Sequence, residues 1–182
     1  MLARYLSSVI VAAMLFLSAA HLQASDLTFF IGGVKPGSIS YNNMKTSLDS
    51  SPVYGFRLGT NFVPFFGMEH TLAFSSDYLF PRNTSIKEAK GFVYNSNLIF
   101  NLPVGMAVPY VTAGAGVLHQ YGDSDLPIGT KFAFNYGGGI KFPRMAGPLG
   151  LRVDLRGYRA GVFSNKVNLF EISGGVLLSL GR

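Results

Sequence analysis

Charged side chains at every second position of residues 151–158 have a spacing that could support chemistry. Arg152, Asp154 and Arg156 alternate with aliphatic residues there. Side chains two positions apart share one face of a β-strand. A carboxylate between two guanidinium groups can serve acid–base chemistry, or it can form buried ion pairs. Because an unpaired buried charge is very costly, we expect structural pairing rather than a catalytic site.

Neighbouring segments with the same alternation add charges of both signs to this face. We expect them to form one ion-pair and hydrogen-bond network that fills the interior of a closed sheet. The predicted network consists of Arg57, Glu69, Lys131, Lys141, Arg152, Asp154, Arg156 and Glu171.

Motifs for other chemistry are weak. A catalytic triad needs a nucleophile, a histidine and an acid within hydrogen-bond reach. His119 lies near Asp123 and Ser124 in sequence, but an interfacial aromatic position explains it as well. No zinc-type His/Glu pair or phosphate loop occurs, and the glycines at 137–139 are followed by more strand rather than by a helix. The sequence therefore predicts no catalytic residue, no metal site and no cofactor.

The elements that position these residues are strands. Period-2 alternation recurs in segments bounded by Pro, Gly, Asn and Asp, which predicts an all-β fold of eight antiparallel strands. The expected strands are residues 27–35, 53–62, 67–80, 90–102, 107–121, 130–142, 150–160 and 168–180. The connections at 63–66, 102–106 and 143–149 are tight, and those at 36–52, 81–89, 122–129 and 161–167 are longer or more polar. Short periplasmic turns alternating with longer outside loops are typical of an outer-membrane barrel.

The N-terminus reads as a targeting segment. Arg4 precedes an unbroken apolar run at residues 9–17, and small residues follow at 18–20 and 24. We interpret residues 1–24 as a secretory signal peptide, with cleavage after Ala24 favoured over Ala20. The expected domain is then residues 25–182. It has no apolar stretch of about 18 residues, so a membrane-spanning helix is not expected.

Composition fits a sheet with one face in lipid. Charged residues make up 13% of the chain, aromatic residues 14%, and cysteine is absent. The net charge of +6 comes from scattered Lys and Arg with no run, so we do not expect nucleic-acid binding. Outer-membrane lipids and lipopolysaccharide are the expected surroundings, and we expect a monomer.

Each expected strand has a bulky apolar face and a smaller polar one. In 53–62, Tyr54, Phe56 and Leu58 alternate with Gly55 and Arg57. A soluble lipocalin-like barrel would turn the aromatic face inward. However, the interior of eight strands is narrow and suits the smaller face. The polar face also carries too few charges for a water-exposed exterior. We therefore expect the aromatic face in lipid.

His70 and His119 fall on the apolar face, and we expect both near the membrane interfaces.

The final segment resembles the insertion signal that barrel-assembly machinery recognises in the last strand. The pattern is Ser173, Gly175, Leu178 and Leu180 at polar, glycine and apolar positions. It departs from the usual signal because the final apolar residue is not aromatic and Gly181-Arg182 follow it. The resemblance implies that the assembly machinery is a partner.

Three stretches, residues 109–116, 134–141 and 151–158, together resemble the outer-membrane β-barrel domain family of OmpA/OmpX-like small porin-family proteins. The resemblance implies an eight-stranded barrel with a polar, mostly plugged interior, but no single activity. We expect a non-enzymatic barrel that supports the envelope or presents loops outside. The alternatives are a narrow passive pore and a lipid A-modifying enzyme. The third is disfavoured because residues 159–165 lack the histidine of the His-x-Ser-Asn element found in barrel deacylases.

Overall fold

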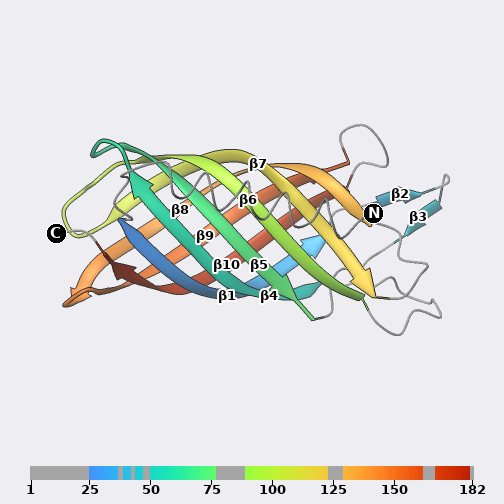
Figure 1. The fold of residues 1–182 in the computed structure, drawn as a ribbon, viewed down its shortest axis with the longest axis horizontal. Coiled ribbons are helices and arrows are strands. Elements are labelled where there is room, and N and C mark those ends of the chain that lie inside the picture. The colour runs from blue at the N-terminus through green and yellow to red at the C-terminus, as the bar shows by residue number, and fades with distance from the viewer. Residues whose placement is uncertain are drawn as a thin grey trace, which may run out of the picture.

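The structure is a closed β-barrel, seen in a computed structural model that describes residues 25–36, 39–41, 44–46, 50–76, 89–122, 129–161 and 167–180 (Figure 1). The predicted signal peptide, residues 1–24, lies outside the described residues. The barrel strands are β1 (Asp26–Pro36), β4 (Ser51–Asn61), β5 (Phe66–Ser75), β6 (Ala89–Asn101), β7 (Val108–Gly122), β8 (Thr130–Ala146), β9 (Leu149–Ala160) and β10 (Val167–Ser179). Among the described residues, no helix is long and apolar enough to cross a membrane.

Consecutive barrel strands pair with each other in antiparallel fashion, and the first strand closes on the last. The order around the wall is β1-β10-β9-β8-β7-β6-β5-β4. The β1–β10 contact runs without interruption from Asp26↔Ser179 to Pro36↔Leu169. The predicted eight-stranded antiparallel barrel is therefore confirmed.

The strands are strongly inclined to the barrel axis. Following paired residues around the wall from Asp26 leads through Gly59, Glu69, Asn97, Gly114, Asn135, Tyr158 and Leu169 to Pro36. This path returns to β1 at Pro36, ten residues beyond its starting point at Asp26. A stagger of this size requires a strand tilt of roughly 35–45°. Figure 1 shows this inclination of the strands relative to the long axis of the barrel.

The connections alternate in length as predicted. Short turns join β4 to β5, β6 to β7 and β8 to β9, and the other connections are longer. We call the end with the short turns the inner end and the opposite end the outer end. In one short turn, the backbone N–H groups of Val63 and Phe66 each donate to the carbonyl of the other, at 3.2 Å.

Three features differ most from the sequence prediction, which places the other strand ends within about two residues. β5 ends at Ser75, and the predicted continuation to residue 80 lies outside the described residues from 77 on. β8 continues to Ala146 through a register irregularity after Phe142, so the expected turn shrinks to Gly147-Pro148. Arg144 in this extension has a φ of 56°. Its side chain is exposed, so this part of β8 does not need to alternate between inward and outward side chains. A small hairpin, β2 (Ile39–Tyr41) with β3 (Met44–Thr46), occupies the predicted 36–52 loop.

The two faces of the wall are oriented as expected. Bulky apolar side chains cover the outside, where Tyr136 is 64% exposed and Leu98 66%. Arg57, Arg152 and Arg156 point inward and are at most 1% exposed. The tilt leaves a narrow interior, so both the smaller side chains and the paired charges must pack there.

Candidate functional site

The barrel interior contains a layer of six mutually paired charges, which we call the charged layer. Strand alternation directs each of these side chains inward from its strand. The layer consists of Arg57 on β4, Glu69 on β5, Arg152, Asp154 and Arg156 on β9, and Glu171 on β10.

Asp154 lies at the centre of this layer. Its carboxylate accepts hydrogen bonds from Arg152 Nε and Nη2 at 2.9 Å each, and from Arg57 Nη1 and Arg156 Nη2 at 3.1 Å each. The Tyr110 hydroxyl also donates to it. Three guanidinium groups thus surround one carboxylate, which makes Asp154 the residue on which the arrangement most depends.

The other two carboxylates complete the charge neutralisation. Glu69 accepts a hydrogen bond from Arg156 Nη2 at 2.5 Å, and it forms an ion pair with Arg152, whose Nη1 lies 2.5 Å from Glu69 Oε2. Glu171 accepts hydrogen bonds from Arg57 Nη2 at 2.5 Å and from the Tyr158 hydroxyl at 2.6 Å. Three positive and three negative groups leave the layer neutral, as a buried set requires.

Sequence reasoning missed several contributors to this layer. Phe30 and Tyr110 belong to residue types that the lipid-facing prediction assigned outward, yet both are 5% exposed and face inward. The Arg57 guanidinium stacks 3.7 Å above the Phe30 ring, and that of Arg152 lies 4.7 Å from the Tyr110 ring. Phe30 lies two and four residues after the polar residues Thr28 and Asp26 on β1. Alternate residues of a strand share one face, so this spacing would have placed Phe30 inside.

Two residues of the predicted network lie apart from it. Lys141 forms its own ion pair near the inner end, with Nζ 2.8 Å from Asp26 Oδ2. Asp26 was not anticipated as a partner. Lys131 faces inward but is only half-buried near the outer end of β8, and no ion pair joins it to another residue in the described part of the chain. Lys131 therefore lies outside the charged layer.

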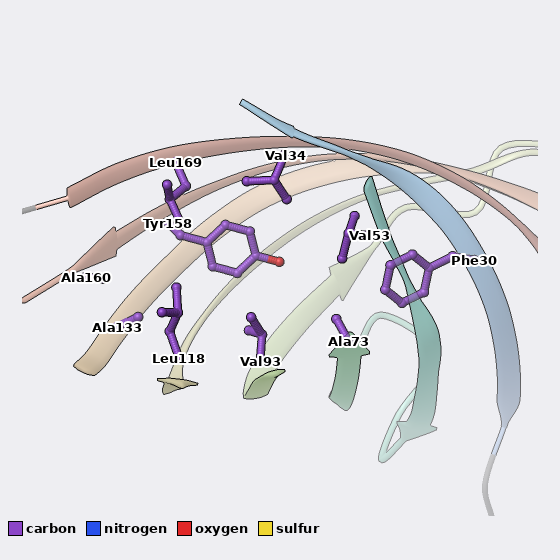
Figure 2. Packing of buried hydrophobic residues seen from close by; sticks show 10 residues of the cluster. All are labelled: Phe30, Val34, Val53, Ala73, Val93, Leu118, Ala133, Tyr158, Ala160 and Leu169. Atoms are coloured by element: carbon purple, nitrogen blue, oxygen red, sulfur yellow. The ribbon is translucent and has the colours of Figure 1, made fainter. Parts of the chain in front are cut away.

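Beyond the charged layer, toward the outer end, lies an apolar layer with one buried side chain from each barrel strand. It consists of Val34, Val53, Ala73, Val93, Leu118, Ala133, Ala160 and Leu169. On β4, for instance, Val53 lies four residues nearer the outer end than Arg57. Figure 2 shows these side chains converging from the surrounding strands, with the Tyr158 ring among them.

The junction of the two layers is tightly filled. A cavity of about 10 Å³ remains between Val53, Val93, Tyr158 and Glu171. This volume lies at the lower limit for a single water molecule. By contrast, a pocket of about 340 Å³ opens at the inner end, lined in part by Asp26, Asn101, Lys141 and Arg144. Among the described residues, the interior is therefore open to solvent at the inner end and tightly filled where the two layers meet.

The four residues of the C-terminal pattern divide between the two faces of β10. Ser173 and Gly175 face inward, and Leu178 and Leu180 face outward. Ser173 donates a hydrogen bond to Glu171 at 2.8 Å. A Cβ at Gly175 would come within 2.4 Å of the Phe29 carbonyl oxygen, so the β1–β10 seam requires glycine there. Recognition of this pattern by the assembly machinery stays a prediction from the sequence.

The two histidines lie on the outer surface at different depths. His119 is near the outer end, as expected, with Nδ1 2.7 Å from Thr130 Oγ1 and its ring stacked on Tyr121. The prediction for His70 is wrong, because His70 is the fifth of the ten residues of β5 and lies midway along the wall. Among the described residues, no group of three or more His, Cys, Asp or Glu could hold a metal ion.

A closed antiparallel barrel with an apolar exterior and paired charges in its interior is an integral membrane barrel of the outer-membrane type. The sequence agrees, because residues 9–173 match the family described as outer membrane protein beta-barrel domain. The chain belongs to this family and is located in the outer membrane. No curated protein sequence matches it.

Solved structures of small outer-membrane barrels have the same fold. Neisserial surface protein A (NspA) is 14% identical with a TM-score of 0.65, over 85% of this chain and 96% of that one. OprG from Pseudomonas aeruginosa is 13% identical with a TM-score of 0.59, over 88% and 98%. The outer membrane enzyme PagL is 12% identical with a TM-score of 0.53, over 85% and 99%. Identities this low establish a shared fold and nothing finer.

Proposed function

We propose that this protein is a non-enzymatic barrel with a closed interior, which supports the envelope or presents its outer loops to partners. The observation that supports this proposal best is the double filling of the interior. The charged layer and the apolar layer lie one above the other, and the cavity at their junction has a volume of about 10 Å³.

Both layers oppose passage of a polar solute. An ion crossing the apolar layer would leave water without meeting a compensating charge, which is very costly. Crossing the charged layer would require separating Asp154 from its guanidinium partners, and a buried pair loses several kcal/mol when one partner is removed. A barrel closed in this way serves through its surface and its loops.

Planar-bilayer recording tests the proposal. We expect the folded protein to show no conductance steps at any applied voltage. Heat-modifiable migration of the same sample on a gel provides the control that the barrel is folded. Reproducible single-channel steps from such a sample would contradict the proposal.

A narrow passive pore is the second candidate, and two observations favour it. The pocket at the inner end already admits solvent to the level of Lys141. Buried side-chain atoms of Thr71 and Asn95, neighbours on β5 and β6, have no hydrogen-bond partner among the described residues and would accept water. The apolar layer would then be the gate, and conductance would appear once that layer opened.

The absence of enzymatic activity is part of the proposal. The fold is shared with the enzyme PagL, so the assay must address lipid chemistry directly. We expect mass spectrometry of lipid A to give identical spectra from cells with and without the protein. Loss of an acyl chain in the presence of the protein would overturn the proposal and revive the lipid A-modifying alternative.

Lipopolysaccharide is the proposed contact of the outer end. Lys35 and Arg159 are exposed on the lipid-facing side near that end. Cations at headgroup depth attract anionic lipids. We also propose that outer-membrane assembly machinery inserts the barrel after secretion across the inner membrane.

A further inference from the structure

A polar patch interrupts the greasy outer surface halfway along the wall. We call His70 on β5 with Tyr94 and Ser96 on β6 the midwall patch. His70 pairs directly across the strands with Ser96, and its Nδ1 lies 3.1 Å from the Tyr94 hydroxyl oxygen. The two rings are stacked, with centroids 6.2 Å apart and an interplanar angle of 15°.

Hydrocarbon surrounds this patch. Met68 and Leu72 flank His70 along β5, Leu58 faces it across β4, and Leu98 is 66% exposed next along β6. From His70 the strand continues for four residues to Phe66 and five to Ser75. At the tilt of this barrel, that leaves roughly 10 Å of wall on each side. An ionisable residue at such depth is rare and marks a functional contact by default.

The patch retains one unused hydrogen-bond donor whatever the tautomer. A neutral imidazole has one N–H and one acceptor nitrogen, and a tyrosine has one O–H. If Tyr94 donates to Nδ1, the Nε2–H of His70 remains. If Nδ1–H donates to Tyr94, the tyrosine O–H remains. Within the described part of the chain, no hydrogen bond joins Ser96 to His70, so this donor faces the membrane.

Neither lipid nor water supplies an acceptor at this depth. Acyl chains have no polar atoms, water is absent from the bilayer core, and an unsatisfied polar group there costs several kcal/mol. Headgroup and ester oxygens lie at the membrane boundary, beyond the reach of His70. The acceptor must therefore belong to a protein that presents a polar group at the same depth.

The surface beside the patch allows such a partner to come close. Ser96 pairs with Ala115 on β7, and Ala113 is exposed two residues along the same strand. Small side chains let two membrane-embedded elements approach closely enough for hydrogen bonds between them.

We propose that the midwall patch is the contact between two copies of this chain in the membrane. Two copies related by a two-fold axis along the membrane normal place identical groups at identical depth. The unused donor of each His70–Tyr94 pair then meets the Ser96 or Tyr94 oxygen of the other copy. This proposal replaces the monomer expected from the sequence and does not depend on the proposed function.

Disulfide cross-linking of the full chain in native outer membranes tests this contact. The sequence has no cysteine, so a single introduced thiol reports without background. We expect Ala113→Cys, beside the patch, to form covalent dimers under mild oxidation. Ile31→Cys is the matched control, because residue 31 is 69% exposed to lipid on β1, four strands from β7 in either direction. We expect it to give at least tenfold less dimer.

A second variant isolates the polar groups. His70→Leu with Tyr94→Phe, added to Ala113→Cys, keeps an apolar surface and should fold, as heat-modifiable migration will verify. We expect the dimer fraction to fall at least tenfold. Equal cross-linking of the Ala113→Cys and Ile31→Cys variants would overturn the proposal, as would no dimer from Ala113→Cys or an undiminished dimer in the combined variant. Cross-links from Ala113→Cys to a different protein would also overturn it.

Discussion

The charged layer and the apolar layer fill the same narrow interior by opposite means. In the charged layer, Asp154 pairs with three guanidinium groups at once, so the position of each group depends on the others. In the apolar layer, one side chain from each strand contributes, and none requires a particular partner. The structure of the first region is therefore specified by its charged partners and that of the second by packing volume, so the two should respond differently to substitution.

Asp154→Ala should have the largest effect on this comparison. It leaves Arg57, Arg152 and Arg156 buried with one carboxylate fewer, and breaking a buried ion pair costs about 3–5 kcal/mol. We expect a loss of that size in the free energy of unfolding, measured by urea titration of the barrel in lipid vesicles. Ser173→Ala is the control, because it removes a neutral hydroxyl and leaves every ion pair in place, and hydrogen bonds to charged groups contribute about 1.5–3 kcal/mol. Equal losses for the two variants would refute partner dependence.

Leu118→Ala should have the next largest effect. Leu118 is 1% exposed in the apolar layer, and truncating a buried leucine costs about 2–5 kcal/mol. Leu118→Met keeps the volume and should cost less than about 1.5 kcal/mol in the same titration. If methionine were as damaging as alanine, packing volume would not be what specifies this layer.

Replacing the separate pair at the inner end should have a small effect. Lys141 and Asp26 bind only each other among the charged groups described in the structure. We expect Lys141→Met with Asp26→Leu to change the unfolding free energy by about 1 kcal/mol or less, because apolar residues of similar volume often replace a buried pair at no net cost. Lys141→Met alone leaves Asp26 without its partner and should be clearly worse. A double variant as unstable as this single variant would show that the pair contributes more than mutual neutralisation.

The smallest expected effect is on conductance. Leu118→Ala opens space in the apolar layer while the charged layer stays intact, so we expect its planar-bilayer traces to remain silent. Steps from this variant alone would identify the apolar layer as the sole barrier and favour the gated-pore candidate.

The sequence predicted the eight strands and the inward set Arg152, Asp154 and Arg156, because period-2 alternation reports both strand and face. It did not predict which charges meet. That depends on the stagger of ten residues around the wall, which brings Glu69 on β5 beside Arg152 and Arg156 on β9.

The same reasoning did not predict the apolar layer. Val34, Val53 and Val93 are aliphatic residues on the polar parity of their strands, where a pattern based on polarity gives no signal. His70 was misplaced in depth because the alternation specifies a face and not a distance from the membrane boundary. The irregular end of β8 was missed because its exposed residues follow no alternation.

The pairing of the first strand with the last has a consequence for how the molecule is made. Because β1 joins β10 over its full length, the wall cannot close until Ser179 has been delivered. Contacts between residues so distant in the chain are slow to form. Until then both end strands expose unpaired edges that invite aggregation. β10 must therefore be synthesised, and the chain kept from pairing with other strands, before the barrel can form.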